Sequence, residues 1–120
     1  MQKPIRIVIV DDQPRARKSL KALLSTWTRS AEIREASNGR EALRLAEELP
    51  PDLVLMDVRM PEMDGLEATG QIKARWPQVK VIVLSMYVEH GDEPLAAGAD
   101  AFVGKAEAPD ALLSILSDLV

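Results

Sequence analysis

The 120-residue sequence has no cysteine, few aromatic residues and no long apolar run. The lack of cysteine excludes disulfides, thiol catalysis and cysteine-bound zinc or iron–sulfur sites, and it suits a reducing compartment. Aromatic residues make up only 3% of the chain, so the core must be built from aliphatic side chains. No apolar stretch is long enough to span a bilayer, and the N-terminus has no signal-peptide pattern. We therefore expect a cytoplasmic protein without membrane contact.

The chain has no excess of positive charge, since 19 acidic residues against 15 basic ones give a formal net charge of −4. Proteins that bind nucleic acid directly neutralise its phosphates with Lys and Arg, so we expect no direct nucleic-acid binding by this chain. Basic residues nevertheless gather in one short segment, at Arg15, Arg17, Lys18 and Lys21. Charge patterning leaves two interpretations open: a solvated helix face, or a docking surface for an acidic partner.

Short apolar runs alternate with helical patterns along the whole chain. The runs predict strands at 5–10, 31–36, 52–57, 80–84 and 101–103. Helices are predicted from Pro14 toward Trp27, and at 40–49, 66–75, 88–97 and 108–119. Gly91 and Pro94 fall inside the fourth of these helices, so we expect it to be short or distorted. Five strand–helix repeats in a chain of single-domain length predict one parallel sheet covered on both faces.

Polar residues stand where the predicted strands end. Asp11 and Asp12 follow the first strand, Asp57 ends the third, Ser85 follows the fourth and Lys105 follows the fifth. Each residue alone is more often a turn, cap or surface residue, but the carboxyl ends of parallel strands meet at the ligand-binding edge. Three carboxylates at that edge suit Mg²⁺. With a hydroxyl and an ammonium beside them, they also suit phosphoryl transfer to an aspartate.

Four segments carry a resemblance to a known family. They are Val10-Asp11-Asp12, Asp57-Val58-Arg59-Met60-Pro61-Glu62-Met63-Asp64-Gly65, Leu84-Ser85-Met86, and Ala97-Gly98-Ala99-Asp100-Ala101-Phe102 with the following Lys105. In this order they resemble bacterial response-regulator receiver domains of two-component signalling, closest to the subclass with a helix-turn-helix DNA-binding output. The resemblance implies a doubly wound, flavodoxin-like parallel sheet in the order 2-1-3-4-5. We expect residues 1–120 to be one such domain, with no output domain in this chain.

The resemblance implies a role for each acidic residue. Asp57 would accept a phosphoryl group from a partner histidine kinase. Asp12, Asp57 and the backbone carbonyl of Arg59 would bind Mg²⁺ directly, and Asp11 would act through a metal-bound water.

It also implies how the phosphorylated state is relayed. Ser85 and Lys105 would contact the phosphoryl group, and Phe102 would turn inward when the hydroxyl of Ser85 moves. The changed surface would regulate transcription through a DNA-binding domain, with a homodimer forming on activation.

Two alternatives remain open. A degenerate receiver would serve only as an interaction module, independent of phosphorylation. A Mg²⁺-dependent phosphatase with an aspartate nucleophile typically has a second aspartate two residues later, whereas this chain has Arg59 there. We therefore expect a phosphoacceptor that catalyses its own phosphorylation and dephosphorylation rather than a metabolic enzyme.

Overall fold

The computed structural model describes residues 3–58, 60, 63–85, 97–104 and 110–120. Apart from Ala97, which lies in a turn, the helix predicted at 88–97 falls outside these residues. Arg59 and Lys105 also lie outside them.

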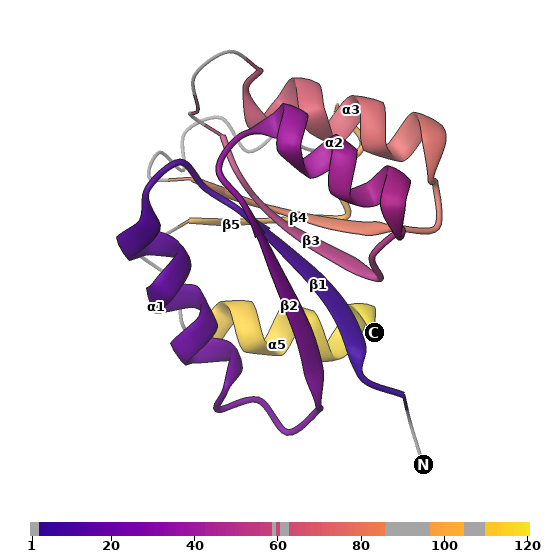
Figure 1. Ribbon diagram of the computed structural model, residues 1–120. Helices are drawn as coiled ribbons and strands as arrows, with labels where there is room; N and C mark the ends of the chain where they lie inside the picture. The colour runs from indigo at the N-terminus through magenta and orange to yellow at the C-terminus, as the bar shows by residue number, and fades with distance from the viewer. Residues whose placement is uncertain (1–2, 59, 61–62, 86–96, 105–109) are drawn as a thin grey trace.

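Five parallel strands form one sheet in the order β2-β1-β3-β4-β5 (Figure 1). They are β1 Ile5–Val10, β2 Ala31–Ala36, β3 Leu53–Asp57, β4 Lys80–Ser85 and β5 Ala101–Gly104. The predicted order is confirmed. The chain adds β2 on one side of β1 and then crosses to add β3 on the other. This reversal makes a topological switch point at the carboxyl ends of β1 and β3, where open α/β sheets bind their ligands.

Four helices in the described part of the chain cover the two faces of the sheet. They are α1 Pro14–Leu24, α2 Gly39–Glu48, α3 Gly65–Arg75 and α5 Asp110–Leu119. Figure 1 shows α2 and α3 on one face and α1 and α5 on the other. None of these helices is long and apolar enough to cross a membrane.

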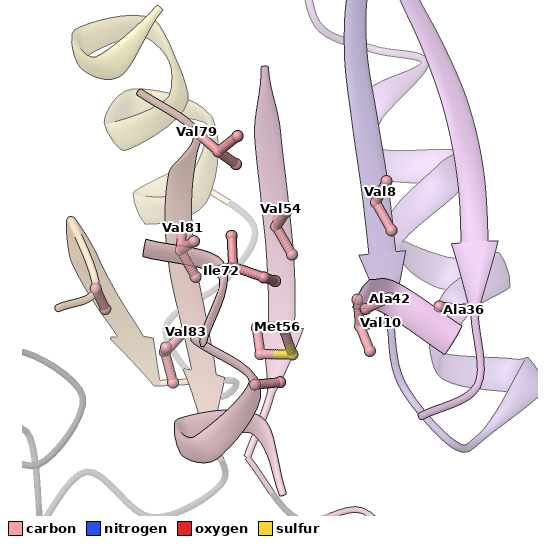
Figure 2. Close-up of a cluster of buried hydrophobic side chains, with 12 residues drawn as sticks. Val8, Val10, Ala36, Ala42, Val54, Met56, Ile72, Val79, Val81 and Val83 are labelled. Atoms are coloured by element: carbon pink, nitrogen blue, oxygen red, sulfur yellow. The ribbon is translucent and has the colours of Figure 1, made fainter. Parts of the chain in front are cut away.

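The core has two layers because side chains alternate between the faces of each strand. In β1, Ile7 and Ile9 pack toward α1 and α5 and belong to the α1/α5 layer. Val8 and Val10 pack toward α2 and α3 and belong to the α2/α3 layer. Figure 2 shows the α2/α3 layer, in which valines of the strands pack against Ala42 of α2 and Ile72 of α3. Both faces of the central strands are therefore buried, which explains why their sequences are almost entirely apolar, with Arg6 of β1 as the polar residue inside a strand.

Helices α1, α2 and α3 differ from their predicted bounds by one to three residues. Helix α2 begins one residue earlier than expected, at Gly39, because the side chain of Asn38 caps it by accepting a hydrogen bond from the Glu41 amide at 2.9 Å. Helix α1 ends at Leu24, so Trp27 lies beyond it. The indole of Trp27 instead packs against the α1/α5 layer and donates to Ser117 Oγ of α5 at 3.2 Å.

Candidate functional site

Three carboxylates converge at the carboxyl ends of β1 and β3. Val10 of β1 is paired with Met56 of β3, so the residues that follow them, Asp11 and Asp57, come to the same edge of the sheet. Oxygen atoms of Asp11, Asp12 and Asp57 all lie within 4.8 Å of one another. Asp11 is 2% exposed and Asp57 is 8% exposed, whereas Asp12 is exposed to solvent. The predicted acidic cluster is therefore present, and it opens to solvent on the Asp12 side.

This geometry is consistent with a Mg²⁺ site. Like charges at such separations repel one another, and burial of Asp11 and Asp57 strengthens the repulsion by removing water. A divalent cation offsets both costs. Mg²⁺ takes oxygen ligands and typically uses one or two carboxylates, several waters and a phosphoryl oxygen. The donor set and the solvent-exposed side of the cluster meet these requirements.

Asp11 is held in place by hydrogen bonds to three of its groups. Its amide donates to the Ala36 carbonyl at 3.1 Å, which continues the pairing of β1 with β2. Its Oδ1 accepts from the Gln13 amide at 3.0 Å, just before α1 begins. Its carbonyl oxygen accepts from Arg17 Nη1 at 2.7 Å. Asp11 is therefore fixed by β2, by the turn that follows it and by α1.

Asp57 is placed by a close approach of α3. The Gly65 amide donates to the Val58 carbonyl at 2.8 Å, which brings the first turn of α3 against the end of β3. A Cβ atom at Gly65 would lie only 1.9 Å from the Asp57 carbonyl oxygen, so only glycine fits there. The preceding Asp64 caps α3 by accepting from the Glu67 amide at 2.8 Å. The loop after Asp57 thus ends in a glycine that the packing of the site requires.

The other predicted site residues that the structure describes, Ser85 and Phe102, lie on β4 and β5. Asp57 is paired with Leu84, and the next residue, Ser85, is paired with Gly104 of β5. Ser85 therefore ends β4 beside the acidic cluster. Phe102 is paired with Val83, is half-buried and packs against the α2/α3 layer.

Two residues of the basic segment after Asp12, Arg17 and Lys21, form ion pairs within the chain. Arg17 Nε lies 3.0 Å from Glu35 Oε1, and Lys21 Nζ lies 3.3 Å from Glu35 Oε2. The hydrogen bond from Arg17, followed by that from Lys21, holds the pKa of Glu35 below its usual value of 4.5, although partial burial opposes the shift. Arg17, only 17% exposed, belongs to this network, which makes it a poor docking residue. Arg15 and Lys18 are exposed.

Comparison with known proteins points to one family. The family profile described as "Response regulator receiver domain" matches residues 7–117. The chain is 41% identical over 103 residues to the response regulator protein VraR of Staphylococcus aureus, covering 84% of this chain and 49% of that protein. The chain spans about half the length of the curated relatives it matches.

Solved structures share the fold closely. The response regulator protein TrrA of Thermotoga maritima, crystallised with Mg²⁺ and BeF, superimposes with a TM-score of 0.87 at 36% identity, covering 97% of this chain and 99% of that one. A DNA-binding response regulator of the LuxR family from Staphylococcus aureus gives a TM-score of 0.85 at 25% identity, covering 96% and 98%.

Proposed function

The chain belongs to the response regulator receiver domain family, and on that premise we propose that Asp57 is the residue that accepts the phosphoryl group. Members of this family are phosphorylation-dependent switches and not classical enzymes. The observation that carries the assignment to Asp57 is its position: it is buried at the end of β3, at the switch point of the sheet and within 4.8 Å of two further carboxylates. A carboxylate oxygen of Asp57 attacks the donor phosphorus while the bond between phosphorus and the donor breaks, so the products are an acyl phosphate on Asp57 and the released donor, the kinase histidine or, with acetyl phosphate, acetate.

Mg²⁺ would be held by Asp12 and Asp57 together with the backbone carbonyl of Arg59, with Asp11 acting through a bound water. When bound, the ion neutralises charge on the phosphoryl oxygens. The protein's own contribution is to hold the acidic residues in place before the donor arrives. The hydrogen bonds to Asp11 and the packing of Gly65 against Asp57 support that role.

Ser85 and Lys105 are our candidates for contacting the phosphoryl group, and Phe102 is our candidate for relaying the change. The strand register supports this proposal, because Ser85 ends the strand next to Asp57 and Lys105 directly follows the residue paired with Ser85. Phosphorylation increases the negative charge and adds acceptor oxygens, so a hydroxyl and an ammonium are drawn toward it. Phe102 already packs at the edge of the core, from which it can move inward.

The donor is a partner histidine kinase, as membership of a two-component family implies. We further propose that the complete protein acts in the cytoplasm and regulates transcription, with activation favouring a homodimer. The similarity to a DNA-binding response regulator of the LuxR family supports the transcriptional output.

The phosphoacceptor proposal is tested by intact mass after incubation with acetyl phosphate. We expect wild type to gain one phosphoryl group in the presence of MgCl₂ and none with excess EDTA. Asp57→Asn keeps the size of the side chain and should gain none. A phosphoryl group on Asp57→Asn at the wild-type rate would refute the assignment.

The same experiment separates the proposal from an interaction module independent of phosphorylation. No adduct on wild type, with acetyl phosphate and with a histidine kinase as donors, would favour the interaction module. The phosphatase alternative has no support in the sequence, since Arg59 occupies the position of the second aspartate.

A further inference from the structure

We propose that Arg17 is a positioning residue for the metal site, acting through the backbone of Asp11 and not by touching the ion. This inference rests on the proposed function and deepens it, because it assigns a role in Mg²⁺ binding to a basic residue on α1.

The guanidinium of Arg17 joins two elements that meet at the site. Its Nη1 donates to the Asp11 carbonyl at 2.7 Å, and its Nε donates to Glu35 Oε1 at 3.0 Å. The first bond reaches the residue after β1, and the second reaches β2, where Glu35 is paired with Ile9. The guanidinium is planar, and its donors are fixed relative to one another. By binding Nε, Glu35 therefore also orients the Nη1 group that donates to the Asp11 carbonyl.

The contacted carbonyl belongs to the peptide unit that joins Asp11 to Asp12. Rotation of this unit would move the Asp12 amide and redirect the Asp12 side chain. The Asp11 amide is held by Ala36 and the Asp11 carboxylate by Gln13, whereas the bond from Arg17 restrains the Asp11 carbonyl. The orientation of Asp12, the exposed member of the acidic pair, therefore depends on Arg17.

Electrostatics alone predicts the opposite effect. Arg17 is a cation close to a site for a divalent cation, so removal of its charge would strengthen Mg²⁺ binding. If Arg17 acts by positioning, its removal weakens Mg²⁺ binding. If it only stabilises the fold, its removal lowers the melting temperature and leaves the Mg²⁺ affinity of the folded protein unchanged. The sign of the change in Mg²⁺ affinity therefore distinguishes a purely electrostatic effect, a positioning role and a purely structural role.

The test is an NMR titration of the full chain with MgCl₂, comparing wild type with Arg17→Met and Lys21→Met. Arg17→Met keeps an extended apolar side chain and removes the donors. Lys21→Met removes the other cation bound to Glu35 and leaves the bond to Asp11 intact, so it is the matched control. We expect Arg17→Met to weaken Mg²⁺ binding about tenfold, the lower end of the range for groups that orient metal ligands. Lys21→Met should bind Mg²⁺ as tightly as wild type or more tightly.

Equal or tighter binding by folded Arg17→Met would overturn the inference, as would an equal loss in Lys21→Met. If Arg17→Met does not give the spectrum of a folded protein, Arg17→Lys decides, since it keeps the positive charge but removes the planar guanidinium that holds Glu35 and the Asp11 carbonyl in a fixed geometry. Weaker Mg²⁺ binding by Arg17→Lys supports the inference, and unchanged binding overturns it. Failure of wild type to bind Mg²⁺ would instead overturn the proposed metal site itself, so the two failures are distinguishable.

Discussion

Replacement of Gly65 by alanine is expected to damage both the fold and the site. A Cβ atom at this position would lie 1.9 Å from the carbonyl oxygen of Asp57, 2.8 Å from its carbonyl carbon and 3.0 Å from Cγ of Met56. Two of these atoms are backbone, so rotation of a flexible side chain cannot relieve the overlap. Either the start of α3 or the peptide after Asp57 must move by about 1 Å or more, given ordinary van der Waals separations.

The loss of folding stability caused by Gly65→Ala can be estimated from the known cost of overpacking an interior. Extra methyl groups in a tightly packed interior typically cost about 1–3 kcal/mol, and contact with fixed backbone places Gly65→Ala at the upper end. For a domain of this size, about 3 kcal/mol lowers the melting temperature by roughly 12 °C. Urea and thermal unfolding measure the loss of stability. Intact mass with acetyl phosphate measures phosphorylation, which should slow because the backbone of Asp57 is displaced.

The same helix offers a matched control. Among the described residues, a Cβ atom at Gly70 would meet only the Ala97 carbonyl oxygen, at an ordinary 3.8 Å. Glycine inside a helix costs about 0.5–1 kcal/mol relative to alanine, so Gly70→Ala should be neutral or stabilising. The reasoning is refuted if Gly65→Ala matches wild type in stability and phosphorylation rate, or if Gly70→Ala destabilises as strongly as Gly65→Ala.

Three further predictions concern polar contacts around the sheet. Asp64→Ala removes the N-cap of α3 and should cost about 1 kcal/mol in urea unfolding; no loss would contradict the capping role. Lys73→Met breaks a half-buried ion pair with Asp100 at 3.0 Å and two hydrogen bonds to backbone carbonyls. It should therefore lower the free energy of unfolding in urea by about 2–4 kcal/mol. A change under about 0.5 kcal/mol, typical of surface positions, would argue against this network. The contact with Arg17 lowers the pKa of Glu35, so its stabilising effect is full at neutral pH and is lost as the pH falls through the lowered pKa. The stability difference between wild type and Glu35→Gln should therefore shrink between about pH 7 and pH 3, and a difference independent of pH would count against the ion pair.

Most of the fold was predictable from local sequence patterns. The strand at Ile5–Val10 was predicted with its exact bounds, because a run of β-branched residues with apolar neighbours specifies a strand buried on both faces. The end of α1 was missed because the apolar spacing continues to Trp27. The hydroxyls of Ser25 and Thr26 instead bond to backbone carbonyls of the preceding turn, and the chain leaves the helix there.

The site was predictable where it follows from topology and motif. Asp11 and Asp12 follow β1 and Asp57 ends β3, and these two strands pair directly, so the strand order alone brings the three residues together. The ion pair between Arg17 and Glu35 was not predictable, because the two residues are 18 positions apart and no spacing rule links α1 to β2. On charge patterning, Arg17 was indistinguishable from its exposed neighbours.

The central claim is that the phosphoryl group resides on Asp57. Borohydride converts an acyl phosphate to an alcohol, so the phosphorylated aspartate becomes homoserine and is identified in a proteolytic peptide by its mass. After phosphorylation with acetyl phosphate and MgCl₂, we predict homoserine at position 57 and nowhere else. Homoserine at position 11 or 12, or phosphorylated protein that yields no homoserine, would contradict the account.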